Sequence, residues 1–201
     1  MPAPKNEQSS VIAMDMQFFF FNAFGMKIKK DNVTLYFARL NESGTIPSLS
    51  QWKRASWRDG KTFYLLNATP GQWVAAGLIY IDPGLLYDTK KAVLFPDEMV
   101  KASKVDVIAR KGTYMGSFQV TQDKDKNILD PTQTFYLQSF LGKESSLKTE
   151  DKITDFIRLD FKQGGVVELC SYTVEQNEAL RKDSRQKAAK DLGAPWAGRF
   201  Q

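Results

Sequence analysis

Four consecutive phenylalanines, Phe18 to Phe21, lie within an apolar segment, residues 11–21, near the start of the 201-residue chain. Aromatic and β-branched residues dominate this segment, which favours a β-strand. Because successive strand side chains point to opposite faces, two phenylalanines enter a core and two need a second layer, a helix or a partner chain. We expect this strand at the centre of a sheet or under a helix, because a strand this apolar at the edge of a sheet would invite aggregation. An edge-to-edge dimer is the alternative.

Other segments share this composition and are bounded by Gly, Pro, Asn or Asp. They are residues 33–40, 61–66, 73–81, 105–109, 114–120, 133–141, 157–161 and 166–169. Pro70-Gly71 fits the centre of a type II turn, which predicts a hairpin between 61–66 and 73–81. A turn at residues 110–112 predicts a hairpin between 105–109 and 114–120. A turn at residues 163–165 predicts another between 157–161 and 166–169. About eight strands with short turns predict an all-β fold with a C-terminal helix, built as an antiparallel β-sandwich.

Two segments carry helical signals. Pro96 opens a short predicted turn of helix at residues 96–101. The stronger signal is Thr173-Val-Glu-Gln176, a capping-box pattern that predicts the start of a helix ending before Gly193 and Pro195. Beyond it, we expect Trp196 to dock the chain end onto the sheet, with an exposed anchor for a partner as the alternative.

These elements predict three parts of the chain. Residues 1–10 form a flexible lead-in, and residues 11–172 form the β-sandwich. Residues 173–201 form the C-terminal helix and a tail packed on the sandwich. The strand-poor segment 41–60 is the predicted largest loop.

The chain has no histidine and one cysteine. Their scarcity excludes His-based triads, histidine ligands, internal disulfides and Cys-rich zinc sites. Cys170, at the end of a predicted strand, is expected to be a small core residue. Glycine-rich phosphate loops are also missing, so we expect no cofactor and no enzymatic activity. A carboxylate-dependent hydrolase is the alternative that survives, with Asp15, Glu98 and Asp106 as candidate acids.

The alternating oxygen-bearing side chains of Asp123, Asp125 and Asn127 are weak candidates for a metal site. An EF-hand calcium loop requires Gly at its sixth position and Glu at its twelfth, where this chain has Ile128 and Thr134. A polar turn between strands is the better interpretation, and we expect no metal.

The candidate ligand-binding residues are Trp52, Arg54, Trp57 and Arg58. Indole faces and guanidinium forks on one loop can stack on sugars or nucleobases. This pattern supports a carbohydrate- or nucleic-acid-binding β-domain, and the competing interpretation is that one or both indoles plug the end of the sandwich. A second basic cluster predicts either a solvated helix face or contact with an anionic surface. It consists of Arg181, Lys182, Arg185, Lys187 and Lys190.

Residues 59–75 contain the pattern Gly60-Lys-Thr-Phe-Tyr-Leu-Leu followed by Pro70-Gly71. This stretch resembles a hairpin of small bacterial envelope β-sandwich modules, the carboxypeptidase-regulatory-like and lipoprotein-associated group, and residues 111–118 look like a later hairpin of such a domain. The resemblance implies a non-enzymatic binding or scaffold module of the cell envelope. It implies a periplasmic or outer-membrane-associated location, tethered by lipid, if an export signal has been removed. The implied partners are envelope proteins, glycans or the membrane surface, and no stretch of about 20 apolar residues predicts a transmembrane segment.

Overall fold

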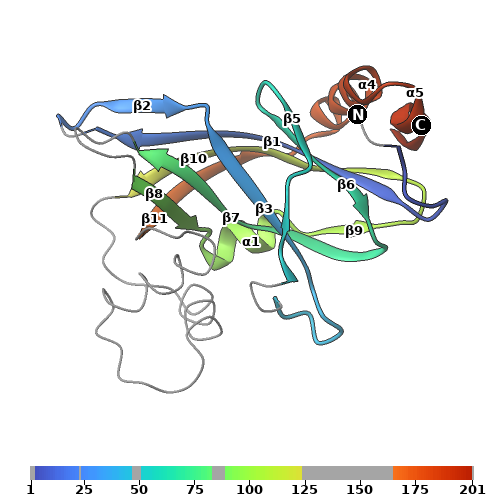
Figure 1. Cartoon of the computed structure of the whole chain (residues 1–201), viewed down its shortest axis with the longest axis horizontal. Helices are drawn as coiled ribbons and strands as arrows, with labels where there is room; N and C mark the ends of the chain where they lie inside the picture. The colour runs from blue at the N-terminus through green and yellow to red at the C-terminus, as the bar shows by residue number, and fades with distance from the viewer. Residues whose placement is uncertain (1–2, 23, 47–50, 83–88, 124–164, 201) are drawn as a thin grey trace.

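A computed structural model of the chain describes residues 3–22, 24–46, 51–82, 89–123 and 165–200 (Figure 1). Within these ranges it contains eleven strands and a C-terminal helical layer. The predicted all-β sandwich with a C-terminal helix is confirmed, with more strands than the eight expected. The strands are β1 (Ser10–Phe21), β2 (Lys27–Lys30), β3 (Val33–Arg39), β4 (Lys53–Arg54), β5 (Trp57–Asp59), β6 (Thr62–Ala68), β7 (Gly71–Asp82), β8 (Thr89–Leu94), β9 (Val105–Val107), β10 (Gly112–Asp123) and β11 (Gly165–Glu175).

The strands form two sheets that share β11. The first sheet has the order β11-β10-β1-β6-β5, with β2 also paired to β1, and the second has the order β4-β3-β7-β8-β11, with β9 paired to β7. Residues 165–168 of β11 pair with β8, and residues 169–175 pair with β10. The β1–β10 and β8–β11 pairings are parallel, so the sandwich is not antiparallel throughout.

Strand β1 lies at the centre of the first sheet, as its composition predicts. It pairs with β10 along one edge and with β6 and then β2 along the other. Phe18 and Phe20 are buried in the core between the sheets, with ring centroids 4.9 and 5.8 Å from that of Tyr80. Phe19 is half-buried, and the Lys27 ammonium lies 4.7 Å from its ring centroid. A lysine of the neighbouring strand therefore supplies part of the cover that the outward phenylalanines need.

The two described hairpin predictions are wrong. Strands β6 and β7 do not pair with each other, because β6 lies between β1 and β5 while β7 lies between β3 and β8. Strand β9 likewise pairs with β7, and β10 pairs with β1 and β11. At both turns the chain passes from one sheet to the other.

Gly71 takes the positive φ that the sequence predicts, although the strand pairing differs. Gly71 has a φ of +133°, a conformation that favours glycine, and a Cβ there would lie 2.6 Å from Nε of Arg39. Across the turn, the indole of Trp73 donates a 2.8 Å hydrogen bond to the carbonyl of Thr69. Trp73 then enters the core between the sheets. Burial of this large side chain favours a corner between sheets over a flat hairpin.

The short helix α1 (Asp97–Ala102) is confirmed, with Pro96 at its N-cap position. The predicted capping box at Thr173 is wrong, because β11 continues to Glu175 in register with β10. Gln176 instead donates hydrogen bonds of 2.7 Å to the carbonyls of Ala102 and Met115. Helix α4 (Glu178–Leu192) begins after Asn177, whose side chain accepts a 2.8 Å hydrogen bond from the Leu180 amide.

A second apolar cluster lies between the outer face of the first sheet and the C-terminal helices. Figure 1 shows these helices beside that sheet. Helix α4 is followed by α5 (Ala194–Ala197) and the 3₁₀ turn η2 (Gly198–Phe200). Trp196 is fully buried in this cluster and Phe200 is almost so, which confirms that Trp196 docks the chain end onto the sheet and rules out its use as an exposed anchor.

The remaining predictions concern separate parts of the chain. The segment 41–60 contains the short strands β4 and β5, so it is less strand-poor than expected. Two contacts involve the segment predicted as a flexible lead-in. The backbone amide of Lys5 donates a 2.7 Å hydrogen bond to the side chain of Asn67, and Glu7 forms an ion pair with Arg110. Cys170 is buried in the core, as predicted. The strands expected at 133–141 and 157–161 lie outside the described residues. In the described part of the chain, no helix is both long and apolar enough to cross a membrane.

Candidate functional site

The predicted tryptophan and arginine residues separate in the structure. Trp52 is buried in the core between the sheets, where it packs on β7: a Cβ at Gly77 would lie 3.5 Å from the indole. Trp57 is half-buried on the outer face, and its ring stacks on Tyr64 with centroids 5.3 Å apart. Both indoles therefore pack against the protein itself, Trp52 between the sheets and Trp57 on the outer face of the first sheet.

The two arginines come together. Arg54 of β4 and Arg58 of β5 line one open groove of about 520 Å³, together with Asp31, Asn32, Thr34 and Tyr36. We refer to this groove, defined by these six residues, as the arginine groove. Arg54 and Tyr36 are direct cross-strand neighbours in the β3–β4 pair. Strand pairing therefore places the guanidinium of Arg54 beside the ring of Tyr36. The sequence pattern predicts a tryptophan in this role.

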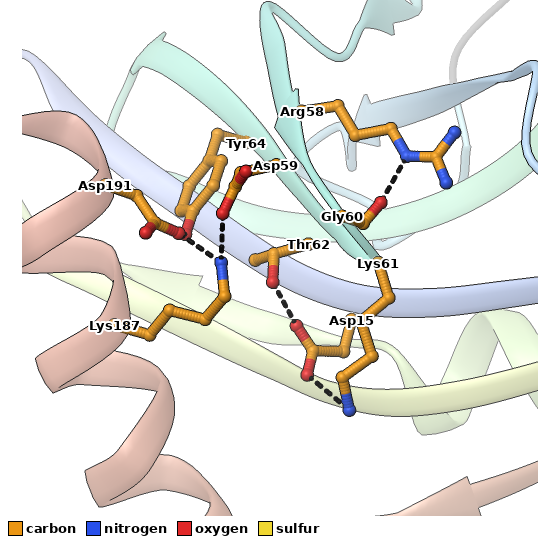
Figure 2. Close-up of polar contacts among 9 residues, drawn as sticks. All are labelled: Asp15, Arg58, Asp59, Gly60, Lys61, Thr62, Tyr64, Lys187 and Asp191. Atoms are coloured by element: carbon orange, nitrogen blue, oxygen red, sulfur yellow. Dashed lines mark hydrogen bonds and ion pairs between the residues drawn. The ribbon is translucent and has the colours of Figure 1, made fainter.

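Arg58 is held firmly by its surroundings. Its Nε donates a 2.6 Å hydrogen bond to the carbonyl of Gly60, which Figure 2 shows, and its Nη1 donates to the carbonyl of Asp31. Its guanidinium lies 4.7 Å from the ring centroid of Phe63, which is in the core. Burial lowers the pKa of Arg58, and the negative charge of Asp31 partly opposes that effect. Arg54, by contrast, is exposed and makes no ion pair to another residue that the structure describes.

The opposite side of the β5–β6 hairpin carries a polar cluster that faces α4 (Figure 2). The hydroxyl of Tyr64 donates a 2.7 Å hydrogen bond to Asp191, and Lys187 donates to Asp191 and, at 2.8 Å, to Asp59. Burial, reinforced by the bond to Asp191, raises the pKa of Tyr64. Burial alone would lower the pKa of Lys187, but the hydrogen bonds to Asp191 and Asp59 outweigh it and raise that pKa. The bond to Lys187 lowers the pKa of Asp59.

Asp15 forms the deepest part of this cluster. It is a buried carboxylate on β1, and it accepts a 2.7 Å hydrogen bond from the hydroxyl of Thr62, its cross-strand partner. Its second oxygen lies 3.1 Å from Nζ of Lys61 (Figure 2). Each carboxylate of the cluster thus contacts a lysine: Asp15 pairs with Lys61, while Asp59 and Asp191 share Lys187. Such pairing is the usual condition for burying a charge.

The remaining candidate acids and metal ligands are dispersed. Glu98 lies on α1 and Asp106 on β9, so the three acids considered for hydrolysis lie on different elements. Asp123 is the last residue of β10, and Asp125 and Asn127 lie outside the described residues.

Sequence reasoning missed Tyr36, Asp31 and the Tyr64–Asp191 contact. Tyr36 is recognisable only as an outward position of a strand, and nothing in its local pattern indicates that β4 will lie beside it. The partners Tyr64 and Asp191 are 127 positions apart, so no local spacing could reveal the contact.

Comparisons with known proteins leave the family open. No family model and no curated protein sequence matches this chain. Among solved structures, it is similar to a proposed carbohydrate-binding protein of Pseudomonas aeruginosa, at 12% sequence identity and a TM-score of 0.27. The match covers 60% of this chain and 92% of that one. A similarity this low carries no argument about the fold or the site.

Proposed function

We propose that this protein is a non-enzymatic binding module and that a glycan binds in its arginine groove. The observation that carries the proposal is the convergence of Arg54, Arg58 and Tyr36, from three different strands, on one open groove. Arg54 and Arg58 belong to the loop that the sequence indicates as a binding site. Tyr36 supplies the aromatic face that the sequence pattern predicts from the indoles of Trp52 and Trp57.

The chemistry of the groove suits a hydroxyl-rich ligand. Guanidinium groups donate several hydrogen bonds in a fixed plane, while the side chains of Asp31 and Asn32 offer acceptors. Tyr36 adds an aromatic ring, which can lie against the apolar face of a sugar. The volume of about 520 Å³ is within the ~300–1,000 Å³ range of ligand-binding pockets.

Much of the groove is fixed before any ligand arrives. The β3–β4 pairing holds Tyr36 beside Arg54, and the carbonyls of Gly60 and Asp31 hold Arg58. Pre-ordered side chains lose little conformational freedom on binding, which preserves affinity. Arg54 is the exposed cation that remains able to reorient toward a ligand.

Calorimetric titration with a panel of neutral and acidic oligosaccharides tests the proposal. For the glycan that binds, we expect Arg54→Ala and Tyr36→Ala each to weaken the affinity about tenfold, the effect of losing ~1.4 kcal/mol. Lys53→Ala is the matched control, because it removes the same charge from the same two-residue strand but does not line the groove. Failure of the whole panel to bind, or an equal loss in the control, would overturn the proposal.

The non-enzymatic part of the proposal is supported by the lack of histidine and by the paired state of Asp15 and Asp191. Prolonged incubation with the bound glycan should leave the glycan intact by mass spectrometry, and cleavage products that vanish in Asp15→Asn would contradict the non-enzymatic proposal.

An envelope location is also proposed, on the resemblance of residues 59–75. A fusion of the natural gene product to a reporter active only outside the cytoplasm should be active, and an inactive fusion would count against this location.

A further inference from the structure

The structure contains a second groove, separate from the arginine groove. It is formed by the β9–β10 turn and α4. It has a volume of about 420 Å³ and is lined by Lys104, Asp106, Lys111, Tyr114, Arg181 and Arg185, among others. We name it the basic groove. We propose that it binds a small soluble polyanion, such as a ligand carrying two or more phosphoryl groups.

The first support is the charge of the groove. Four cations and one carboxylate line it. The cations come from three places in the chain, namely the residue before β9, the β9–β10 turn, and the first half of α4. The fold therefore brings positive charges together that are about 75 residues apart in sequence, at an electrostatic cost that a bound anion would remove.

The second support is the pairing state of these cations. Lys104, Lys111 and Arg185 make no ion pair with any residue that the structure describes. Among the described residues, Arg181 pairs only with Glu178, at 3.9 Å and on an exposed helix surface, where such a pair contributes little. The nearby Arg110 differs, because Glu7 neutralises it. Three of the four cations that line the basic groove thus have no ion pair among the described residues.

The third support is the rigidity of the elements that carry the cations. The Lys111 amide donates to the carbonyl of Ile108, and the Lys111 carbonyl accepts from the Val11 amide, at 3.2 and 3.3 Å. The Ile108 carbonyl also accepts a 2.7 Å hydrogen bond from the hydroxyl of Ser10. On the other wall, the polar cluster and the buried Ala188 and Leu192 fix α4 to the sheet. Backbone positions fixed in this way pre-organise the site.

The shape of the groove favours a compact ligand over a nucleic acid or a membrane. Its cations line an open groove of about 420 Å³, a volume that suits a small molecule. The side chain of Ile108, 56% exposed, and the ring of Tyr114 add an apolar wall. Such a wall would contact the organic part of a phosphorylated ligand.

Titration with inorganic tripolyphosphate tests the proposal in the full chain. We expect binding that weakens as salt increases, and an affinity at least tenfold lower in the double variant Lys111→Ala/Arg185→Ala. The control is Lys182→Ala/Lys190→Ala, which removes the same net charge from exposed positions outside the groove. We expect its affinity to stay within twofold of the unmodified protein, and circular dichroism should confirm that both variants fold.

Three results would overturn the proposal: no tripolyphosphate binding at low salt, an equal loss in both double variants, or binding of anionic vesicles or oligonucleotides that tripolyphosphate fails to displace. The test is independent of the proposed glycan site. Arg54→Ala should leave tripolyphosphate binding unchanged, and the Lys111→Ala/Arg185→Ala variant should leave glycan binding unchanged.

Discussion

The hydroxyl of Tyr64 on β6 donates a 2.7 Å hydrogen bond to the carboxylate of Asp191 near the end of α4 (Figure 2). Tyr64 lies on the same β5–β6 hairpin as Arg58, whose side chain lines the arginine groove. One hairpin therefore contributes to the proposed glycan site on one side and anchors the C-terminal helix on the other. That helix in turn supplies Arg181 and Arg185 to the basic groove.

Removal of the Tyr64 hydroxyl should weaken this anchor. Tyr64→Phe deletes the donor to Asp191 while keeping the ring that stacks on Trp57, and we expect a loss of about 1–2 kcal/mol in the free energy of unfolding, measured by urea denaturation. Tyr114→Phe is the matched control, because the Tyr114 hydroxyl is buried but makes no hydrogen bond of normal geometry with the described residues. Its removal should change stability by less than about 0.5 kcal/mol. Equal losses in the two variants would contradict the anchoring role of the Tyr64–Asp191 bond.

The hydrogen bond from Thr62 to Asp15 should be equally measurable. Thr62 is buried, and Thr62→Val keeps its shape but removes the 2.7 Å bond to the buried carboxylate. We expect a loss of about 1–3 kcal/mol in the free energy of unfolding, because the carboxylate would lose one of its two partners. Thr62→Ser retains the hydroxyl and should recover most of that stability. If the serine variant is no more stable than the valine variant, then packing rather than the hydrogen bond explains the loss.

The positions of the strands could be predicted from the sequence, but the partners of several strands could not. Residues 61–66 and 73–81 carry a clear strand pattern, and Pro70-Gly71 carries a clear turn pattern, yet the turn connects two sheets. Alternation fixes which face of a strand is buried, whereas pairing depends on the whole buried surface that distant strands offer. Here the almost wholly buried strand β1 pairs with β6.

The candidate site shows the same limit at the level of side chains. The sequence indicates the loop 52–58 as a source of binding residues, because it interleaves indoles and guanidiniums. Strand alternation separates them, since Arg58 faces the groove while its neighbour Trp57 faces the helix. The aromatic member of the groove, Tyr36, comes from another strand, and only the β3–β4 pairing reveals it.

High pH should destabilise the protein through its buried tyrosines. Burial raises the pKa of Tyr114 to about 12 and also raises that of Tyr64, so the folded state favours the protonated phenols. In the unfolded chain tyrosine ionises near pH 10. Stability from these groups is therefore fully present below about pH 10 and is lost as the pH rises toward 12.

Urea denaturation at pH 8, 10 and 11.5 measures this loss. Lys187, whose pKa is also raised, contributes in the same direction, so the comparison is between the unmodified protein and Tyr114→Phe. We expect the variant to lose less stability between pH 10 and 11.5, because one phenol no longer ionises preferentially in the unfolded state. A parallel decline in both proteins would show that Tyr114 does not resist ionisation in the folded state.

The docking of the chain end should depend on the contact between Gly112 and Phe200. A Cβ at Gly112 would lie 2.4 Å from the Phe200 ring, so Gly112→Ala should displace that ring and cost about 1–3 kcal/mol in the free energy of unfolding. Gly198→Ala is the control, because nothing lies within 4 Å of its Cβ position and we expect little change. Once Phe200→Ala has removed the ring, adding Gly112→Ala should cost almost nothing. A double-mutant cycle by urea denaturation measures this coupling, and simple additivity would show that the two residues do not meet.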